Sequence, residues 1–304
     1  MDVEKVISLI IPIYNRLEVT KQGLFYISQS VMLYNANVSR NYSVKIIVVD
    51  DGSTDGSYEW IAKAYPEINL IKSKGDLWWT GAINMGIKHA LNTFGNLEGV
   101  ILQNDDIIVN IDWVNNLIAA ITNNRNCLIG CATSTQKNKE ILTYGGRKMN
   151  AWFATEKIIN GGVNRNKFPV GHVVSSFDLY GRGLYIPVEV FSKIGLFNNN
   201  RFKHRGDMDL PLRAKKAGYD LLVCYDAVVY ELPEFTYSLD IKQKISIKEA
   251  IYLLTDFRSS NNLKLIFYYS LVATNNPIQF VVFFTSNLFY NLRRVLWRVL
   301  TPFA

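Results

Sequence analysis

The stretch VILQNDD, residues 100–106, decides the fold expected for this chain of 304 residues. It begins as an apolar run, which favours a strand buried on both faces, and it ends in two adjacent carboxylates. Ligands of open α/β sheets bind beyond the carboxyl ends of the strands, where Asp105 and Asp106 would project. Neighbouring carboxylates repel unless they share a cation, and Mg²⁺ or Mn²⁺ prefers such oxygen ligands beside a phosphate. The alternative is an Asx-rich turn that only ends a strand.

Three further apolar runs precede this stretch. Residues 6–12, 44–49 and 68–72 predict buried strands, the first of them ended by Pro12. Helices are expected over residues 18–34 and 80–94. Strands that alternate with helices at this spacing form right-handed crossovers and a parallel sheet. The sequence therefore predicts a doubly wound α/β fold through about residue 125.

Three predicted loops, at residues 12–16, 50–53 and 104–106, follow strands and should share one edge of the sheet. Asp51 at this edge can accept hydrogen bonds from a nucleobase or from ribose hydroxyls. No Gly-x-Gly-x-x-Gly pattern follows the first strand and no Walker A sequence occurs. Phosphates are therefore expected to be held by a metal ion and side chains.

Composition excludes several classes of protein. With 49% hydrophobic and 19% charged residues the chain is globular, and its net charge of +7 suits an anionic partner. No recognition motif for DNA or RNA occurs, so nucleic acid is not an expected partner. Three cysteines form no disulfide framework. Because acidic residues and a strand begin the sequence, no signal peptide is expected, and we expect a cytoplasmic protein.

Six short motifs, in order, resemble family 2 of the glycosyltransferases, which are inverting nucleotide-sugar enzymes with a GT-A fold. The resemblance covers about residues 5–230, and the form of residues 102–106 together with Gly181-Arg182-Gly183 is most similar to the rhamnosyltransferase-like branch. It implies a Rossmann-like, mostly parallel sheet flanked by helices. The motifs are Pro12-Ile13-Tyr14-Asn15-Arg16, residues 49–55, residues 79–86, residues 102–106, Gly195-Leu196-Phe197, and residues 206–210 with the downstream Arg213 and Lys216-Ala217-Gly218-Tyr219.

The resemblance implies a site for Mg²⁺ or Mn²⁺. Asp106 corresponds to the acid that binds the metal bridging the donor diphosphate, and Asp105 would face ribose or sugar. Asn104 replaces the first acid of the family's Asp-x-Asp element, which lowers the negative charge of the site. Many relatives carry a histidine ligand where this chain has Glu231, so either this carboxylate replaces the histidine or the position is vacant, and His204 is another candidate ligand.

The resemblance also implies a donor site and an acceptor site. Asp207 corresponds to the general base, which we prefer to Asp209, although capping of the following helix is an alternative role for these acids. For Trp78-Trp79 core filling is the alternative role, and Arg182 and His204 are alternatively surface residues. The expected donor contacts are Pro12, Tyr14, Arg16, Asp51, Asp76, Trp78, Asn84 and Asp105. The expected acceptor contacts are Trp79, Arg182, His204 and Asp209.

We expect two domains. Residues 1–235 form the transferase domain, with a nucleotide-binding half at 1–125 and an acceptor half at 126–235 that includes an antiparallel extension between about 127 and 169. Residues 236–304 form a helical segment, with a helix expected over 245–269 and apolar runs at 265–273 and 278–289 that are too short to span a bilayer. Arg293, Arg294 and Arg298 alternate with apolar residues, which is typical of helices at a membrane surface. A packed helix pair and a homodimer face are the alternatives.

The function expected is metal-dependent, inverting transfer of one sugar from a nucleotide diphosphate-sugar of the dTDP-rhamnose or UDP-hexose type. The acceptor would be a glycan or lipid-linked glycan in bacterial surface polysaccharide synthesis, such as O-antigen, with the enzyme peripheral on the inner face of the membrane. The alternative is a non-catalytic nucleotide-sugar-binding or scaffolding subunit.

Overall fold

Four parallel strands form the N-terminal half of the sheet in the computed structural model, which describes residues 4–232 and 244–300. They are β1 (Val6–Ile13), β2 (Ser43–Asp50), β3 (Asn69–Lys72) and β4 (Leu97–Leu102), in the order β4-β1-β2-β3. The helices α1 (Leu17–Ala36), α2 (Ser57–Ala64) and α3 (Trp78–Thr93) connect them. The predicted α/β fold is therefore confirmed.

One strand end differs from the prediction. β1 continues through Pro12 to Ile13, whose partner on β2 is Asp50. Proline is tolerated there because β4 pairs with β1 only as far as Ile10, so Pro12 has a strand neighbour on one side only.

Alternating side chains along the central strands explain why helices cover both faces. Ile101 of β4 packs in the cluster that contains residues of α1 and α4 (Trp113–Asn123). Val100 and Leu102 pack on the other face, with α3, α5 (Val188–Ile194) and α6 (Leu210–Lys216). Successive side chains of a strand point to opposite faces, so an unbroken apolar run requires cover on both sides.

The second half of the sheet is mixed. β11 (Leu184–Pro187) lies antiparallel beside β4, and β6 (Cys127–Thr135) and β12 (Asp220–Glu231) form a parallel pair beyond it. Antiparallel partners are β5 (Ile107–Val109) and β10 (Val173–Ser175) on β12, and β7 (Asn138–Tyr144) on β6. The expected antiparallel extension thus begins with a long buried strand of the main sheet, and β8 (Arg147–Met149) and β9 (Glu156–Ile158) form a separate hairpin.

Three helices end the described chain: α7 (Ile247–Thr255), α8 (Leu263–Ala273) and α9 (Pro277–Leu300). The single helix expected over 245–269 is wrong, because Asn262 caps a new helix by accepting a hydrogen bond from the Leu265 amide. The apolar run expected at 278–289 is part of one helix of 24 residues. No helix in the described ranges is long and apolar enough to cross a membrane. The domain boundary expected at 235/236 lies outside the described residues.

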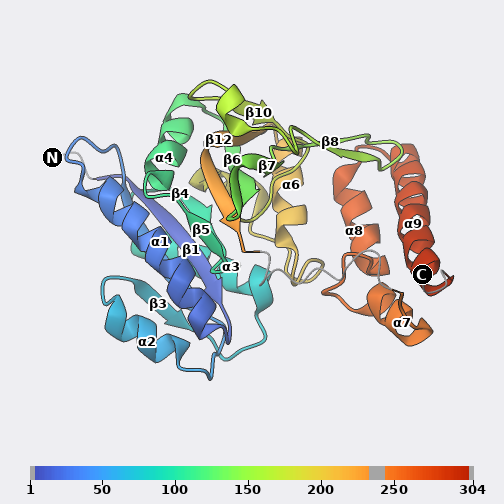
Figure 1. The fold of residues 1–304 in the computed structure, drawn as a ribbon, viewed down its shortest axis with the longest axis horizontal. Helices are drawn as coiled ribbons and strands as arrows, with labels where there is room; N and C mark the ends of the chain where they lie inside the picture. The colour runs from blue at the N-terminus through green and yellow to red at the C-terminus, as the bar shows by residue number, and fades with distance from the viewer. Residues whose placement is uncertain (1–3, 233–243, 301–304) are drawn as a thin grey trace.

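The C-terminal helices pack on the main body. Leu265, Tyr269 and Phe283 join Phe202 and Leu212 in one small apolar cluster. In Figure 1 α7, α8 and α9 lie together at the opposite end of the molecule from α2 and β3, and the β8–β9 hairpin extends toward them. The described residues also form two short 3-10 helices, η1 (Arg165–Lys167) and η2 (Gly206–Met208).

Candidate functional site

The two acids after β4 occupy different environments. Asp105 is buried. Its carboxylate accepts one hydrogen bond from the Arg16 guanidinium and another, of 2.8 Å, from the Thr20 hydroxyl. Burial raises the pKa of Asp105 to about 6, against the opposing effect of the Arg16 charge. Asp106 keeps 19% of its side chain exposed and accepts from Arg16 at 3.1 Å. Asp105 was expected to face ribose or sugar. In the structure its carboxylate accepts from Arg16, and Asp106 is the more exposed acid.

A glycine of α1 permits this arrangement. A Cβ on Gly23 would lie 2.1 Å from the main-chain carbonyl oxygen of Asp105, so a side chain at residue 23 would displace the loop. Neither the composition of α1 nor its periodicity indicated this close approach.

Glu231 lies beside the same loop. It pairs with Ile107 across the β5–β12 ladder, so it is one register step from Asp106, and its carboxylate forms an ion pair of 2.5 Å with Arg182. No cluster of three or more His, Cys, Asp or Glu side chains is present in the described part of the chain. The carboxylate oxygens of Asp106 and Glu231 are of the kind that Mg²⁺ or Mn²⁺ prefers, and such ions are commonly held by one or two carboxylates together with substrate phosphates.

Asp51 and Asn84 both form hydrogen bonds with neighbouring segments of the protein. The Asp51 carboxylate accepts from the Ser73 hydroxyl at 2.7 Å and from the amides of Leu77 and Trp78 at 3.0 and 2.8 Å. Asn84 donates to the Phe197 carbonyl at 2.9 Å and accepts from the Phe197 amide at 3.1 Å. Both residues were expected to contact nucleotide, and in the structure these hydrogen bonds connect them to the loops around α3.

The other expected donor contacts lie at the carboxyl edge of the sheet. Tyr14 is exposed, and Pro12 and Trp78 are half-buried. The Trp78 indole donates to Asp76 at 2.9 Å, and Lys203 forms an ion pair of 2.7 Å with the same carboxylate. His204 lies edge-on to the Trp78 ring. This edge therefore offers aromatic and charged side chains to a ligand.

The two acids that precede α6, Asp207 and Asp209, have different partners. One of its oxygens accepts a hydrogen bond of 3.0 Å from the Gly181 amide. Asp209 is 1% exposed and is held by the Arg213 guanidinium at 2.8 and 3.0 Å and by the Asn198 amide at 3.2 Å. Asp209 was expected to contact the acceptor; in the structure its buried carboxylate is the ion-pair partner of Arg213.

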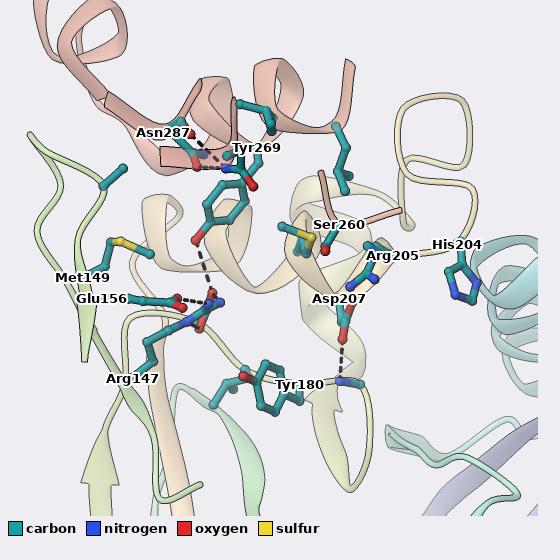
Figure 2. Close-up of a pocket in the computed structure, with 18 of the residues that line it drawn as sticks. Arg147, Met149, Glu156, Tyr180, His204, Arg205, Asp207, Ser260, Tyr269 and Asn287 are labelled. Carbon is teal, nitrogen blue, oxygen red and sulfur yellow. Dashed lines mark hydrogen bonds and ion pairs between the residues drawn. The ribbon is translucent and has the colours of Figure 1, made fainter. Parts of the chain in front are cut away.

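A cavity of about 900 Å³ is lined by Asp207, by Asn104 of the loop that follows β4 (the strand-end loop, residues 103–106) and by residues of the C-terminal helices. Figure 2 shows Asp207 pointing toward the Gly181 amide, with Tyr269 and Asn287 entering from the C-terminal helices above. The expected site residues that line the cavity are Trp79, Arg182, His204 and Asp207.

Trp79 contacts both Asn104, in the loop after β4, and the loop at Gly181. Its indole donates to the Asn104 side chain at 3.1 Å. A Cβ on Gly181 would lie 2.5 Å from the Trp79 ring and 3.4 Å from the Asp207 Cβ. The absence of a side chain at residue 181 therefore lets the ring pack against the loop that holds the Asp207 carboxylate.

Sequence reasoning missed one ionic cluster in the cavity wall. The guanidinium of Arg147 donates to Asp178 at 2.8 Å and to Glu156 at 2.6 Å, and the Tyr269 hydroxyl donates to Asp178 at 3.4 Å. Burial raises the pKa of Asp178, and the Arg147 charge acts in the opposite direction. The one available signal was an acid between Phe177 and Leu179, three residues before Gly181.

Comparisons with known proteins agree with this fold. The low-salt glycan biosynthesis hexosyltransferase Agl10 of Haloferax volcanii is 23% identical over 189 residues, which are 59% of this chain and only 56% of Agl10. The mannosyltransferase PcManGT from Pyrobaculum calidifontis, solved with GDP-Man and Mn²⁺, aligns with a TM-score of 0.58 and 14% identity, over 98% of this chain and 74% of that one.

A structure of S. aureus TarS 1-349 with UDP-GlcNAc aligns with a TM-score of 0.57 and 13% identity, over 95% of this chain and 72% of that one. These likenesses confirm the expected GT-A fold. The sequence model described as glycosyl transferase family 2 matches residues 8–183, which is more than half of the chain. The chain belongs to glycosyl transferase family 2.

Proposed function

We propose that this chain is an inverting glycosyltransferase that moves a single sugar from a nucleotide diphosphate-sugar to a glycan or lipid-linked glycan, with Mg²⁺ or Mn²⁺ as cofactor. The observation that carries it is the Asp207 carboxylate, which lies in a cavity shared with Asn104 of the strand-end loop. Family membership and the hexosyltransferase relative support sugar transfer as the reaction.

Asp207 is suited to act as the general base. The Gly181 amide fixes one carboxylate oxygen, so the other oxygen can accept the proton of an acceptor hydroxyl. As that hydroxyl attacks the anomeric carbon, the bond to the diphosphate breaks on the opposite face and the proton passes to Asp207. A base in this role contributes about 10²–10⁴-fold in rate.

Asp106 and Glu231 would hold the metal ion together with oxygens of the donor diphosphate. The ion would supply positive charge to the leaving group. Arg16 forms an ion pair with Asp106, and Arg182 forms one with Glu231. Two guanidinium groups would therefore also contact a diphosphate bound there. We assign Pro12, Tyr14, Asp76 and Trp78 to the nucleotide side, while Asp51 and Asn84 position the surrounding loops.

The acceptor would occupy the cavity. Trp79, Arg182 and His204 line it from the transferase body. Tyr269, Asn287 and Tyr290 line it from the C-terminal helices. Aromatic faces beside a few placed polar groups are typical of sites for small polar ligands. A donor of the dTDP-rhamnose or UDP-hexose type, an O-antigen-like product and a cytoplasmic location are parts of this proposal.

The experiment that tests it is donor turnover, measured as release of nucleoside diphosphate from dTDP-rhamnose, UDP-glucose and GDP-mannose. Each donor is tested with Mn²⁺, Mg²⁺ or EDTA, with and without a lipid-linked glycan fraction as acceptor. We expect metal-dependent release from one class of donor, lost in Asp207→Asn. Donor binding without release under every condition would instead support a non-catalytic subunit.

A further inference from the structure

The C-terminal helices expose most of the large apolar side chains on the described surface. Of the 24 large hydrophobic side chains exposed in residues 4–232 and 244–300, 14 lie within 244–300. Single exposed apolar residues are ordinary, whereas a concentration of them in one small segment indicates an interaction surface.

These side chains form stripes on the helices. In α9 the outward residues are 54–76% exposed, and at 3.6 residues per turn they lie on the face opposite the buried residues. The outward stripe is Ile278, Val281, Phe289, Leu296 and Leu300. The buried residues are Gln279, Phe283, Asn291, Val295 and Arg298.

The two neighbouring helices continue the pattern. Leu263, Phe267 and Leu271 are exposed at four-residue spacing on α8, and Ile247 and Ile251 on α7. Residues four apart lie on one face of a helix. The three helices contact one another and lie together at one end of the molecule (Figure 1).

The same segment is basic. Residues 244–300 contain seven Lys and Arg and two acidic residues, which gives a net charge of +5. Lys248, Lys264 and Arg293 are exposed on the three helices in turn. Exposed apolar stripes with basic residues and an exposed Trp297 are the features of helices that lie in the interface of an anionic membrane.

We propose that α7, α8 and α9 form a docking face for an anionic phospholipid bilayer, with the outward stripe of α9 in the interface. A second copy of the chain fits less well, because an isologous dimer would place two segments of charge +5 against each other. An anionic lipid surface complements both the charge and the apolar stripes.

Docking would bring the bilayer close to the cavity, and this further step rests on the proposed function. Tyr290 and Arg294 line the cavity and are also exposed, so the cavity reaches the surface on α9, beside the docking face. An acceptor whose lipid lies in the bilayer could then present its sugar to Asp207 without leaving the membrane.

The test is flotation of the full chain with vesicles of phosphatidylcholine, alone or mixed with phosphatidylglycerol. We expect flotation with the anionic vesicles, weakened by high salt and reduced more than about tenfold in the triple variant Ile278→Ser, Phe289→Ser, Leu296→Ser. The matched control is Val38→Ser with Val170→Ser, which removes two apolar side chains that are 93% and 95% exposed outside this segment. Thermal melting of both variants verifies that they fold.

Two results would overturn membrane docking. One is equal flotation of the folded triple variant and the wild type. The other is no flotation of the wild type with anionic vesicles. In that case, light scattering that shows a dimer of the wild type and a monomer of the triple variant would assign the face to a second copy. Donor turnover in the absence of vesicles separates this outcome from the proposed function, because the triple variant leaves Asp106 and Asp207 unchanged.

Discussion

Replacement of Asp207 by asparagine should separate catalysis from folding. The side-chain oxygen of asparagine can still accept the 3.0 Å hydrogen bond from the Gly181 amide, so the loop should keep its position. The variant cannot take a proton from an acceptor hydroxyl at neutral pH. We expect kcat to fall about 10²–10⁴-fold, which corresponds to about 3–5 kcal/mol of transition-state stabilisation.

The assay follows initial rates of sugar transfer at saturating donor, together with the dissociation constant of the nucleoside diphosphate. Loss of the base should lower kcat and leave nucleotide affinity unchanged. The matched control is Asp209→Asn, which weakens a buried ion pair with Arg213 outside the cavity. That variant should lose about 1–3 kcal/mol of folding stability.

The reasoning would be refuted if Asp207→Asn retained kcat within tenfold of the wild type. A folded Asp209→Asn protein with normal nucleotide binding and no transfer would move the role of base to Asp209.

Three further predictions concern the surrounding loops and the metal. Gly181→Ala places a Cβ 2.5 Å from the Trp79 ring, so the ring or the loop must move, kcat should fall and the intrinsic fluorescence should change. An unchanged rate would show that the loop adapts freely. Asn84→Ala removes the partner of the Phe197 amide and one of the two hydrogen bonds to the Phe197 carbonyl, so urea denaturation should show a loss of about 1–3 kcal/mol. An equal loss of nucleotide affinity in the folded protein would instead show ligand contact. Glu231→Gln should raise the Mn²⁺ concentration needed for half-maximal turnover, and an unchanged requirement would exclude Glu231 as a ligand.

The parallel half of the fold could be predicted because its strands are unbroken apolar runs followed by polar turns. The second half could not, because the β6–β12 pair joins Cys127 to Asp220, and nothing local determines such a register. The break between α7 and α8 was missed although the polar run Arg258-Ser259-Ser260-Asn261-Asn262 lies between the two helices. Asn262, a residue favoured as a helix cap, was the available signal.

Motifs indicated a candidate site but could not show which of its residues hydrogen-bond to neighbouring loops of the protein. Asp51 and Asp209 are acids in the expected places, and the structure occupies both with protein donors. Whether a carboxylate meets a ligand or a backbone amide depends on loop geometry, which composition does not determine. The cavity wall was also invisible in the sequence, because Arg147, Asp178 and Tyr269 come from three distant segments.

Metal-dependent nucleotide binding tests the central claim most directly. Thermal melting is measured with UDP, dTDP and GDP, each with Mn²⁺ or EDTA, for the wild type and Asp106→Asn. We predict that one nucleotide stabilises the wild type with Mn²⁺, by about 2.7 kcal/mol at a hundred times its dissociation constant, and that EDTA or the substitution removes this effect. Two results would contradict the assignment of the carboxyl edge of the sheet as a metal-dependent donor site. One is that no nucleotide raises the melting temperature with Mn²⁺ or with EDTA, and the other is that the stabilisation survives both EDTA and the substitution.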